Sequence, residues 1–429
     1  MATPVSNSVA LPAIDGGNGT LTDEFINGLV QGSSWQFGGG PRTLTYSFNL
    51  NDGPGGPFTG AFVDAVNRAL AEWSNVANIS FQNIASGSFY YQSQADIAFT
   101  LTGFELQRDL GAVGLGVFPD PVFANTLRDG IGYTAAEYPN PTGDVFLDSF
   151  YSGYSVLYAG GFGFNAILHE IGHALGLKHP NDDGGNGRPT FAQLGISTSD
   201  SERWTVMTNN HTEVNFFGGY AASPMPADIL AIQQIYGANM SYHVGNDTYL
   251  LPNPLISVHQ MRWTVWDAGG VDTIDASLFS FFGASIDIRP GGVTKELQPV
   301  VSPGWEMYLA YGVTIENVIG GAGSDIIVGN DTNNILSGNG GADNIQGGDG
   351  YSGPQIQDSR LSYTLSWESR KNERNEEAQG AHTGIQSESR LGGITRGKDD
   401  QPDCSGLRCS SSANRAVEKR DTGTSQNTV

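Results

Sequence analysis

Up to about residue 240, short apolar segments alternate with longer segments of helical periodicity. Residues Thr59–Ser74 carry one apolar face, and Thr59 stands where a helix N-cap is expected. Helices are also predicted over Phe164–Leu175 and over Ala227–Tyr236, which Pro226 precedes and Gly237 follows. Runs rich in β-branched and aromatic residues predict strands at Leu44–Phe48, Ile79–Ile84, Asp96–Leu101, Val113–Phe118 and Asp144–Asp148. Strands with one face covered by long helices predict an α+β domain over residues 21–238.

A nine-residue period replaces the helical pattern further along the chain. Its rows are Gly320–Val328, Gly329–Ser337 and Gly338–Gln346. The sixth position of each row is Asp or Asn, and the eighth is a large apolar residue: Asp325, Asn334 and Asp343, then Ile327, Leu336 and Ile345. These rows predict an all-β parallel β-roll over residues 239–351, in which glycine turns present carbonyl oxygens to calcium. The alternative is a flexible glycine-rich linker, which has no need to keep Asp and Ile in step.

The two ends of the chain carry neither pattern. Residues 1–20 lack a basic start and an apolar run, so we expect a flexible leader rather than a Sec signal peptide. In the fourth row Ser352 takes the acidic position and Pro354 the apolar one, and residues 352–429 are polar, which predicts a disordered tail. Our hypothesis is that this tail comes from a shifted reading frame or an unrelated fusion, and a naturally divergent tail is the alternative. Cys404 and Cys409 have no further ligands near them and are interpreted as incidental.

The charge of the chain is −23 and is unevenly distributed. Residues 1–354 hold 10 Lys and Arg against 33 Asp and Glu, whereas residues 355–429 hold 11 of each. Such acidity argues against nucleic acid and anionic membranes as partners. It suits a glycine-rich protein that is stabilised by calcium outside the cell. No apolar run approaches the length of a membrane span.

Three of the seven histidines fall within one short segment. His169 and His173 lie one helical turn apart, so both imidazoles can reach one ion, and Glu170 stands beside them as a base. His179 would be about 15 Å from His169 on a continuous helix, so the helix must end, and Gly176 is the residue type that allows a turn there. Three imidazoles and a water complete a tetrahedral Zn²⁺ site with an open position. A helix with surface histidines is the alternative.

These residues, with Pro180 and the downstream Thr205–Met207, resemble the metzincin metalloproteases and among them the serralysin family. The tracts Ile232–Met240, Trp266–Asp272 and Gly312–Gly321 are also similar to serralysins. The likeness covers about residues 21–351. It implies a metzincin catalytic domain before the roll, and Met207 as the Met-turn beneath the zinc.

The resemblance also implies a function. It indicates a secreted, monomeric endopeptidase that hydrolyses protein and peptide substrates, with Glu170 as general base for a zinc-activated water. The family uses type I secretion, although its C-terminal signal is not visible in this sequence. Ca²⁺ is expected to gate the folding of the roll. The calcium ligands that the family likeness implies are Asp267, Gly269, Gly270, Asp272, Thr314, Glu316, Gly321, Gly323, Asp325, Asn330, Thr332, Asn334, Asn339, Gly341 and Asp343.

One position departs from the family. Serralysins typically carry Tyr two residues after the Met-turn methionine, where this sequence has Asn209. Tyr220 or His211 could substitute, or both could be surface loop residues. For substrate binding by strand addition, Asp144–Asp148 is our candidate edge strand, and an interior strand is the alternative.

Two other functions therefore stay open. One is a calcium-binding repeat protein, structural or adhesive, whose zinc site is vestigial and whose catalysis is impaired. The other is a zincin that acts on a non-peptide substrate.

Overall fold

The computed structural model describes residues 2–12, 20–49, 58–84, 93–102, 112–130, 132–212, 219–252, 261–297 and 304–348. Contacts divide the chain into Met1–Trp367 and Glu368–Val429, and every described residue lies in the first unit. The predicted tail and part of the predicted leader lie outside the described residues. Within the described ranges, no helix has the length and apolarity to cross a membrane.

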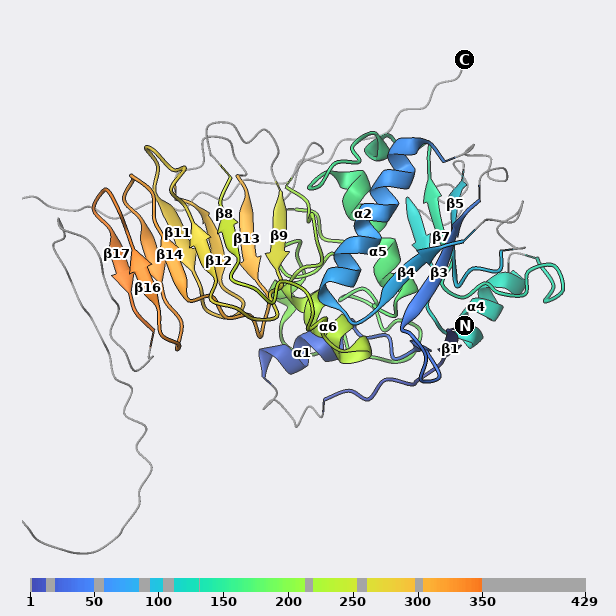
Figure 1. Cartoon of the computed structure of the whole chain (residues 1–429). Helices are drawn as coiled ribbons and strands as arrows, with labels where there is room; N and C mark the ends of the chain where they lie inside the picture. The colour runs from blue at the N-terminus through green and yellow to red at the C-terminus, as the bar shows by residue number, and fades with distance from the viewer. Residues whose placement is uncertain are drawn as a thin grey trace, which may run out of the picture. The chain divides into compact units, whose positions relative to one another are not determined.

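A five-stranded sheet lies at the centre of the N-terminal half (Figure 1). The strand order is β4-β3-β5-β7-β6, with β6 antiparallel to β7 and the other neighbours parallel. The five predicted strands are confirmed as β3 (Thr43–Phe48), β4 (Ser80–Asn83), β5 (Ile97–Thr102), β6 (Gly114–Gly116) and β7 (Val145–Asp148). The prediction that Asp144–Asp148 forms the sheet edge is wrong, because β6 folds back alongside β7 and becomes the edge.

Three helices of the N-terminal half match the predicted ones. These are α2 (Gly60–Val76), with Thr59 as N-cap, α5 (Phe162–Ala174) and α6 (Pro226–Tyr236). The structure also contains helices that were not predicted: α1 (Leu21–Leu29), α4 (Pro121–Gly130) and the short 3₁₀ helices η2 (Ser152–Ser155) and η3 (Ser197–Ser199). In α1 the sequence does hold a start signal, since Thr20 and Asp23 form a capping box.

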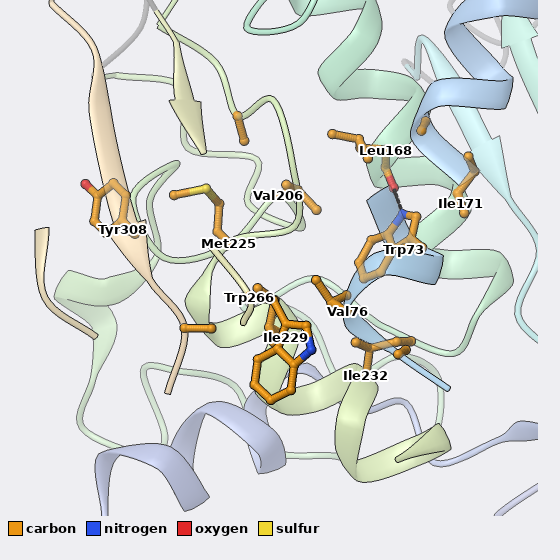
Figure 2. Close-up of a cluster of buried hydrophobic side chains, with 14 of the residues drawn as sticks. Trp73, Val76, Leu168, Ile171, Val206, Met225, Ile229, Ile232, Trp266 and Tyr308 are labelled. Atoms are coloured by element: carbon orange, nitrogen blue, oxygen red, sulfur yellow. Dashed lines mark hydrogen bonds between the residues drawn. The ribbon is translucent and has the colours of Figure 1, made fainter. Parts of the chain in front are cut away.

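The helices α2 and α5 are held together by a buried tryptophan. Trp73 on α2 is fully buried, and its indole nitrogen donates to the carbonyl of Leu168 on α5 at 3.2 Å (Figure 2). Val206 and Ile229 belong to the same apolar cluster. This packing fixes the position of α5, which carries two of the candidate zinc ligands.

The N-terminal segment is more regular than predicted. Strand β1 (Thr3–Val5) pairs antiparallel with β2 (Ser34–Gln36), which places Thr3 opposite Gln36. The side chain of Ser6 donates to Asp120 at 2.5 Å. Residues 3–5 thus differ from the irregular leader that was expected, because pairing with a distant strand satisfies their backbone.

The C-terminal half consists of two further sheets. One has the parallel order β16-β14-β10-β8, and the other has the mixed order β17-β15-β11-β12-β13-β9. Figure 1 shows these strands stacked beside one another. Their bounds are β8 Thr248–Leu250, β9 Arg262–Val265, β10 Thr273–Asp275, β11 Ala284–Asp287, β12 Val293–Glu296, β13 Glu306–Leu309, β14 Asn317–Ile319, β15 Ile326–Val328, β16 Ile335–Ser337 and β17 Asn344–Gln346.

The nine-residue rows correspond to strands that alternate between these two sheets. Each row ends in one strand, and strands two rows apart pair in parallel, as Asn317 does with Ile335 and Ile326 with Asn344. The eighth-position residues Ile327 and Leu336 are fully buried. The period therefore predicts the strands correctly, since the glycine turns carry the chain from one sheet to the other.

Candidate metal centre

Three imidazoles converge where α5 ends. His169 and His173 project from one face of the helix, and the chain turns back at Gly176, whose φ is +105°. A Cβ at Gly176 would lie 2.6 Å from the carbonyl oxygen of Ser33, so a larger residue would also clash. The turn brings Nε2 of His179 to 3.1 Å from Nε2 of both other histidines. The helix end predicted at Gly176 is confirmed.

The other ring nitrogen of each histidine has an acceptor. Nδ1 of His169 lies 2.8 Å from the carbonyl oxygen of Val206, Nδ1 of His173 lies 2.8 Å from that of Leu177, and Nδ1 of His179 lies 2.5 Å from Asp182 Oδ2. An acceptor at Nδ1 holds the proton there and leaves the Nε2 lone pair for a metal.

The donor set fits zinc. Nitrogens at about 2.0–2.1 Å from a tetrahedral zinc ion lie roughly 3.3–3.4 Å apart. The observed 3.1 Å separations are close to that spacing. Burial, together with the charge of His179, lowers the pKa of His169 to about 3, and burial also lowers the pKa of His173 well below its usual value. Neutral imidazoles are the form that ligates zinc.

Glu170 lies beside these histidines and packs against the edge strand. Burial raises the pKa of its carboxyl to about 8, which a hydrogen bond from the backbone of Gly116 opposes. A Cβ at Gly114 would lie 2.4 Å from Glu170 Oε1, and one at Gly116 would lie 2.2 Å from the carbonyl oxygen of Glu170. The two glycines of β6 thus allow the strand to approach α5 closely.

A cleft of about 690 Å³ contains the histidines and Glu170. The edge strand β6 with the residues before it lines this cleft, and so do Asn209 and His211. Aromatic side chains line it as well, among them Phe118, Tyr151 and Phe162. An extended peptide can lie in such a cleft beside the strand edge.

The predicted Met-turn lies beneath α5. Met207 is fully buried, and a Cβ at Gly172, between the two helical histidines, would lie 2.5 Å from its sulfur. Asp228 at the start of α6 anchors the turn, because its carboxylate accepts from Thr205 Oγ1 at 2.6 Å, from the Val206 amide at 2.7 Å and from the Met225 amide at 2.9 Å. Asp228 therefore steadies Val206, whose carbonyl holds His169.

The two residues considered as substitutes for a tyrosine differ in position. His211 lines the cleft, and its Nδ1 lies 2.6 Å from Oε1 of the fully buried Glu202. Tyr220 is buried, and its ring contacts that of His211 with the centroids 5.8 Å apart at an interplanar angle of 59°. The surface-loop interpretation of Tyr220 is wrong, because its side chain is buried.

The first group of predicted calcium ligands meets in space. Glu316 Oε2 accepts from the amide of Asp272 at 2.7 Å, and Asp272 Oδ2 is buried without a hydrogen-bond partner among the described residues. Burial and the neighbouring carboxylates Asp267, Glu316 and Asp247 raise the pKa of Asp272 to about 6. Crowded carboxylates with an unsatisfied buried oxygen fit a hard cation such as calcium.

Several predicted ligands in the rows form hydrogen bonds within the protein. Asp325 Oδ2 accepts from the amide of Gly321 at 2.8 Å, and the amide of Asp325 donates to Asp343 at 2.9 Å. In the second row, Asn330 Nδ2 donates to the carbonyl of Ile315 at 2.7 Å, and Asn334 Nδ2 donates to that of Glu316 at 3.3 Å. The side chains of Asn330 and Asn334 are thus already hydrogen-bonded within the protein and carry no charge, so the second row is the weakest candidate.

Several site residues were not predicted from the sequence. His243 and Asp247 offer ligand atoms within 4.8 Å of Asp267, forming a second group that could hold a metal. Asp182 and Asp228 were missed as well, although each follows a recognisable signal: Asp182 lies three residues after His179, and Asp228 sits in the first turn of α6.

Comparison with known proteins gives one family. Residues 234–362 match the family model described as Peptidase M10 serralysin C terminal, so the match ends inside the tail predicted from residue 352. The chain is 33% identical over 321 residues to a serralysin of Proteus mirabilis, an alignment that covers 70% of this chain and 61% of that protein.

Two other relatives have similar sequence identity and coverage. Metallopeptidase AprA of Pseudomonas marginalis is 31% identical over 291 residues, which are 62% of this chain and 54% of that protein. Serralysin G of Dickeya chrysanthemi is 31% identical over 341 residues, which are 73% of this chain and 65% of that protein. The chain thus matches less than two thirds of the length of each of these relatives.

Proposed function

Because the chain belongs to the serralysin family, we propose that it is a secreted, zinc-dependent endopeptidase that hydrolyses peptide bonds in proteins. The observation that carries the proposal is the convergence of Nε2 of His169, His173 and His179 in a cleft that also contains Glu170. Two helical histidines with an adjacent glutamate are the arrangement of a zinc peptidase, and Met207 supports them from below.

The three histidines hold the metal in this proposal. Zinc supplies, when bound, a water of lowered pKa and polarisation of the substrate carbonyl. Glu170 takes the proton of the attacking water and passes it to the leaving amine. The substrate lies along β6, which is the edge strand of the sheet among the described residues and offers backbone hydrogen bonds, while Gly114 and Gly116 let Glu170 approach that edge.

Calcium is the second proposed cofactor. The group around Asp267, Asp272 and Glu316 is the first candidate site, and the alternating sheets of residues 239–351 would close into a β-roll when calcium neutralises its carboxylates. A circular-dichroism titration of the metal-free protein with Ca²⁺ tests this step. We expect a gain in ordered structure at millimolar calcium, and no gain would overturn the proposed gating.

A zinc-dependence assay with one variant tests the enzymatic function. The wild type should cleave casein, and a zinc chelator should abolish the cleavage. Glu170→Gln should keep its zinc but lose activity by about 10²–10⁴-fold, because it removes the proton acceptor. Glu24→Gln is the matched control, since Glu24 is also helical and lies on α1, away from the cleft.

The calcium-binding repeat protein with an impaired zinc site is the second candidate. Asn209, in place of the tyrosine usual in the family, favours it, because an amide is a shorter side chain and a poor zinc ligand. A wild-type protein that binds zinc and calcium but cleaves no casein would replace the peptidase with this candidate.

A further inference from the structure

A carboxylate and an imidazole form a pair at the cleft, and the imidazole lines it. His211 lines the cleft with His169 and Glu170. Glu202 stands behind it, fully buried, with Oε1 2.6 Å from His211 Nδ1. Neither residue belongs to the zinc motif.

The pair is tied to the helix that carries the zinc ligands. The second oxygen of Glu202, Oε2, accepts from Asn165 Nδ2 at 3.4 Å. Asn165 is buried on α5, one turn before His169 and on the same face. Glu202 thus couples the orientation of His211 to the helix of the metal centre.

Two aromatic rings restrict the imidazole further. Phe162 lies 6.4 Å from the His211 ring at an interplanar angle of 75°, and Tyr220 lies 5.8 Å away at 59°. These contacts and the Glu202 hydrogen bond fix the ring from several sides. A fixed ring loses less entropy when it binds a substrate group.

The hydrogen bond also decides which nitrogen faces the cleft. Nδ1–H donates to the Glu202 carboxylate, so Nε2 is the nitrogen left for a ligand. Within the described part of the chain, Nε2 of His211 has no hydrogen-bond partner. The buried carboxylate can balance a positive charge on the ring, and a charged imidazole carries a proton on Nε2 as well.

We infer that His211 is a catalytic residue whose Nε2–H donates a hydrogen bond to the oxygen of the scissile carbonyl, and that Glu202 is its positioning residue. Negative charge gathers on that oxygen as water adds to the carbonyl carbon, so a donor fixed in the cleft stabilises the transition state more than the substrate. The proton stays on His211 in this role. The inference rests on the proposed peptidase function.

His211→Phe tests the inference, because Phe keeps the packing against Phe162 and Tyr220 but has no donor. The control is Thr212→Ala, an exposed neighbour on the same loop that is not among the residues lining the cleft. We expect kcat of His211→Phe to fall about 10²-fold, in the range of one lost oxyanion donor, with KM changed less than about threefold. Zinc content and melting temperature should match the wild type.

A binding measurement separates the role from zinc loading and turnover. A peptide phosphinate carries a charged tetrahedral group in place of the scissile bond, whereas a product peptide does not. By calorimetry, His211→Phe should bind the phosphinate about 10²-fold more weakly and the product peptide equally well. Glu202→Gln should lower kcat while KM stays within about threefold, since it misplaces the donor without touching the substrate.

The outcomes are distinct. If the wild type cleaves casein and His211→Phe keeps both its kcat and its phosphinate affinity, the inference is wrong and the peptidase function stands. If the wild type shows no zinc-dependent cleavage, the peptidase function and this inference fail together. Equal losses in His211→Phe and Thr212→Ala would also overturn it, because they would show a general disturbance of the loop that carries both residues. Should Glu202→Gln fail to fold, His211→Phe still decides.

Discussion

Asp182 is the one side chain among the three acceptors that hold the candidate zinc ligands. Its Oδ2 lies 2.5 Å from Nδ1 of His179, and its Oδ1 accepts from the amide of Gly184 at 2.8 Å. Burial raises the pKa of Asp182, but the hydrogen bond with His179 and its charge outweigh burial and hold that pKa below its usual range. The carboxylate therefore serves two donors at once.

In the variant Asp182→Asn, the side-chain amide cannot accept hydrogen bonds from both His179 and Gly184. If the amide oxygen stays on the Gly184 amide, the NH₂ group faces His179, whose Nδ1 must then accept and whose proton moves to Nε2. If the oxygen faces His179, the NH₂ group meets the N–H of Gly184 and the turn loses a hydrogen bond. Either arrangement weakens the third zinc ligand.

The expected loss is a 10–100-fold weaker zinc affinity, the usual size of an outer-shell change, which corresponds to about 1.4–2.7 kcal/mol. Competition of the metal-free protein with a chromophoric zinc chelator measures it. Asp183→Asn is the matched control, because Asp183 is the exposed neighbour, makes the same charge change and caps only the amide of Gly185. Equal affinities for the two variants would refute the assignment of Asp182 to the metal centre.

Three further predictions concern stability. Gly116→Ala should lower the free energy of unfolding by about 1–3 kcal/mol, because the new Cβ would lie 2.2 Å from the Glu170 carbonyl; an unchanged denaturation curve would contradict the close packing of β6 on α5. Asp228→Asn should cost about 1–3 kcal/mol, since its three donors cannot all be satisfied by an amide, and urea denaturation measures the loss. Burial raises the pKa of Glu72 from 4.5 to about 7, so its contribution to stability is lost as pH rises through that window. Glu72→Gln should therefore be more stable than the wild type at pH 8 but not at pH 4, and parallel pH curves would disprove this.

Local periodicity predicted the elements that depend on neighbouring residues. The i, i+4 histidines and Gly176 determine where α5 ends, and the nine-residue rows determine β15 and β16, because both patterns act within one or two turns of chain. The order of strands in a sheet is not local. The composition of Asp144–Asp148 suits a strand at an edge or in the interior of a sheet. Only the pairing of β6 with β7 shows that this strand lies in the interior.

Side-chain contacts between residues that a loop brings together could not be predicted from the sequence either. Glu202 and His211 are brought together by a loop, with no spacing rule that would pair them, and the pairing becomes visible only as a 2.6 Å contact. The same holds for Asp228, whose position at the start of α6 predicts a helix cap but not an anchor for residues 205 and 206.

The metal centre distributes its support unequally between backbone and side chains. Val206 and Leu177 hold their histidines through carbonyl oxygens, which substitution at those positions leaves in place. Only His179 has a side chain, Asp182, as the hydrogen-bond acceptor of its Nδ1. A point mutation can therefore remove an acceptor of the zinc ligands directly only at Asp182. A mutation can change the two backbone acceptors only indirectly, through the side chains that position them. For the carbonyl of Val206, that side chain is Asp228. Zinc affinity should therefore be more sensitive to Asp182→Asn than to Asp228→Asn, whereas stability should show the opposite order; the reverse result would mean that the carbonyl of Val206 is less firmly held than its contacts indicate.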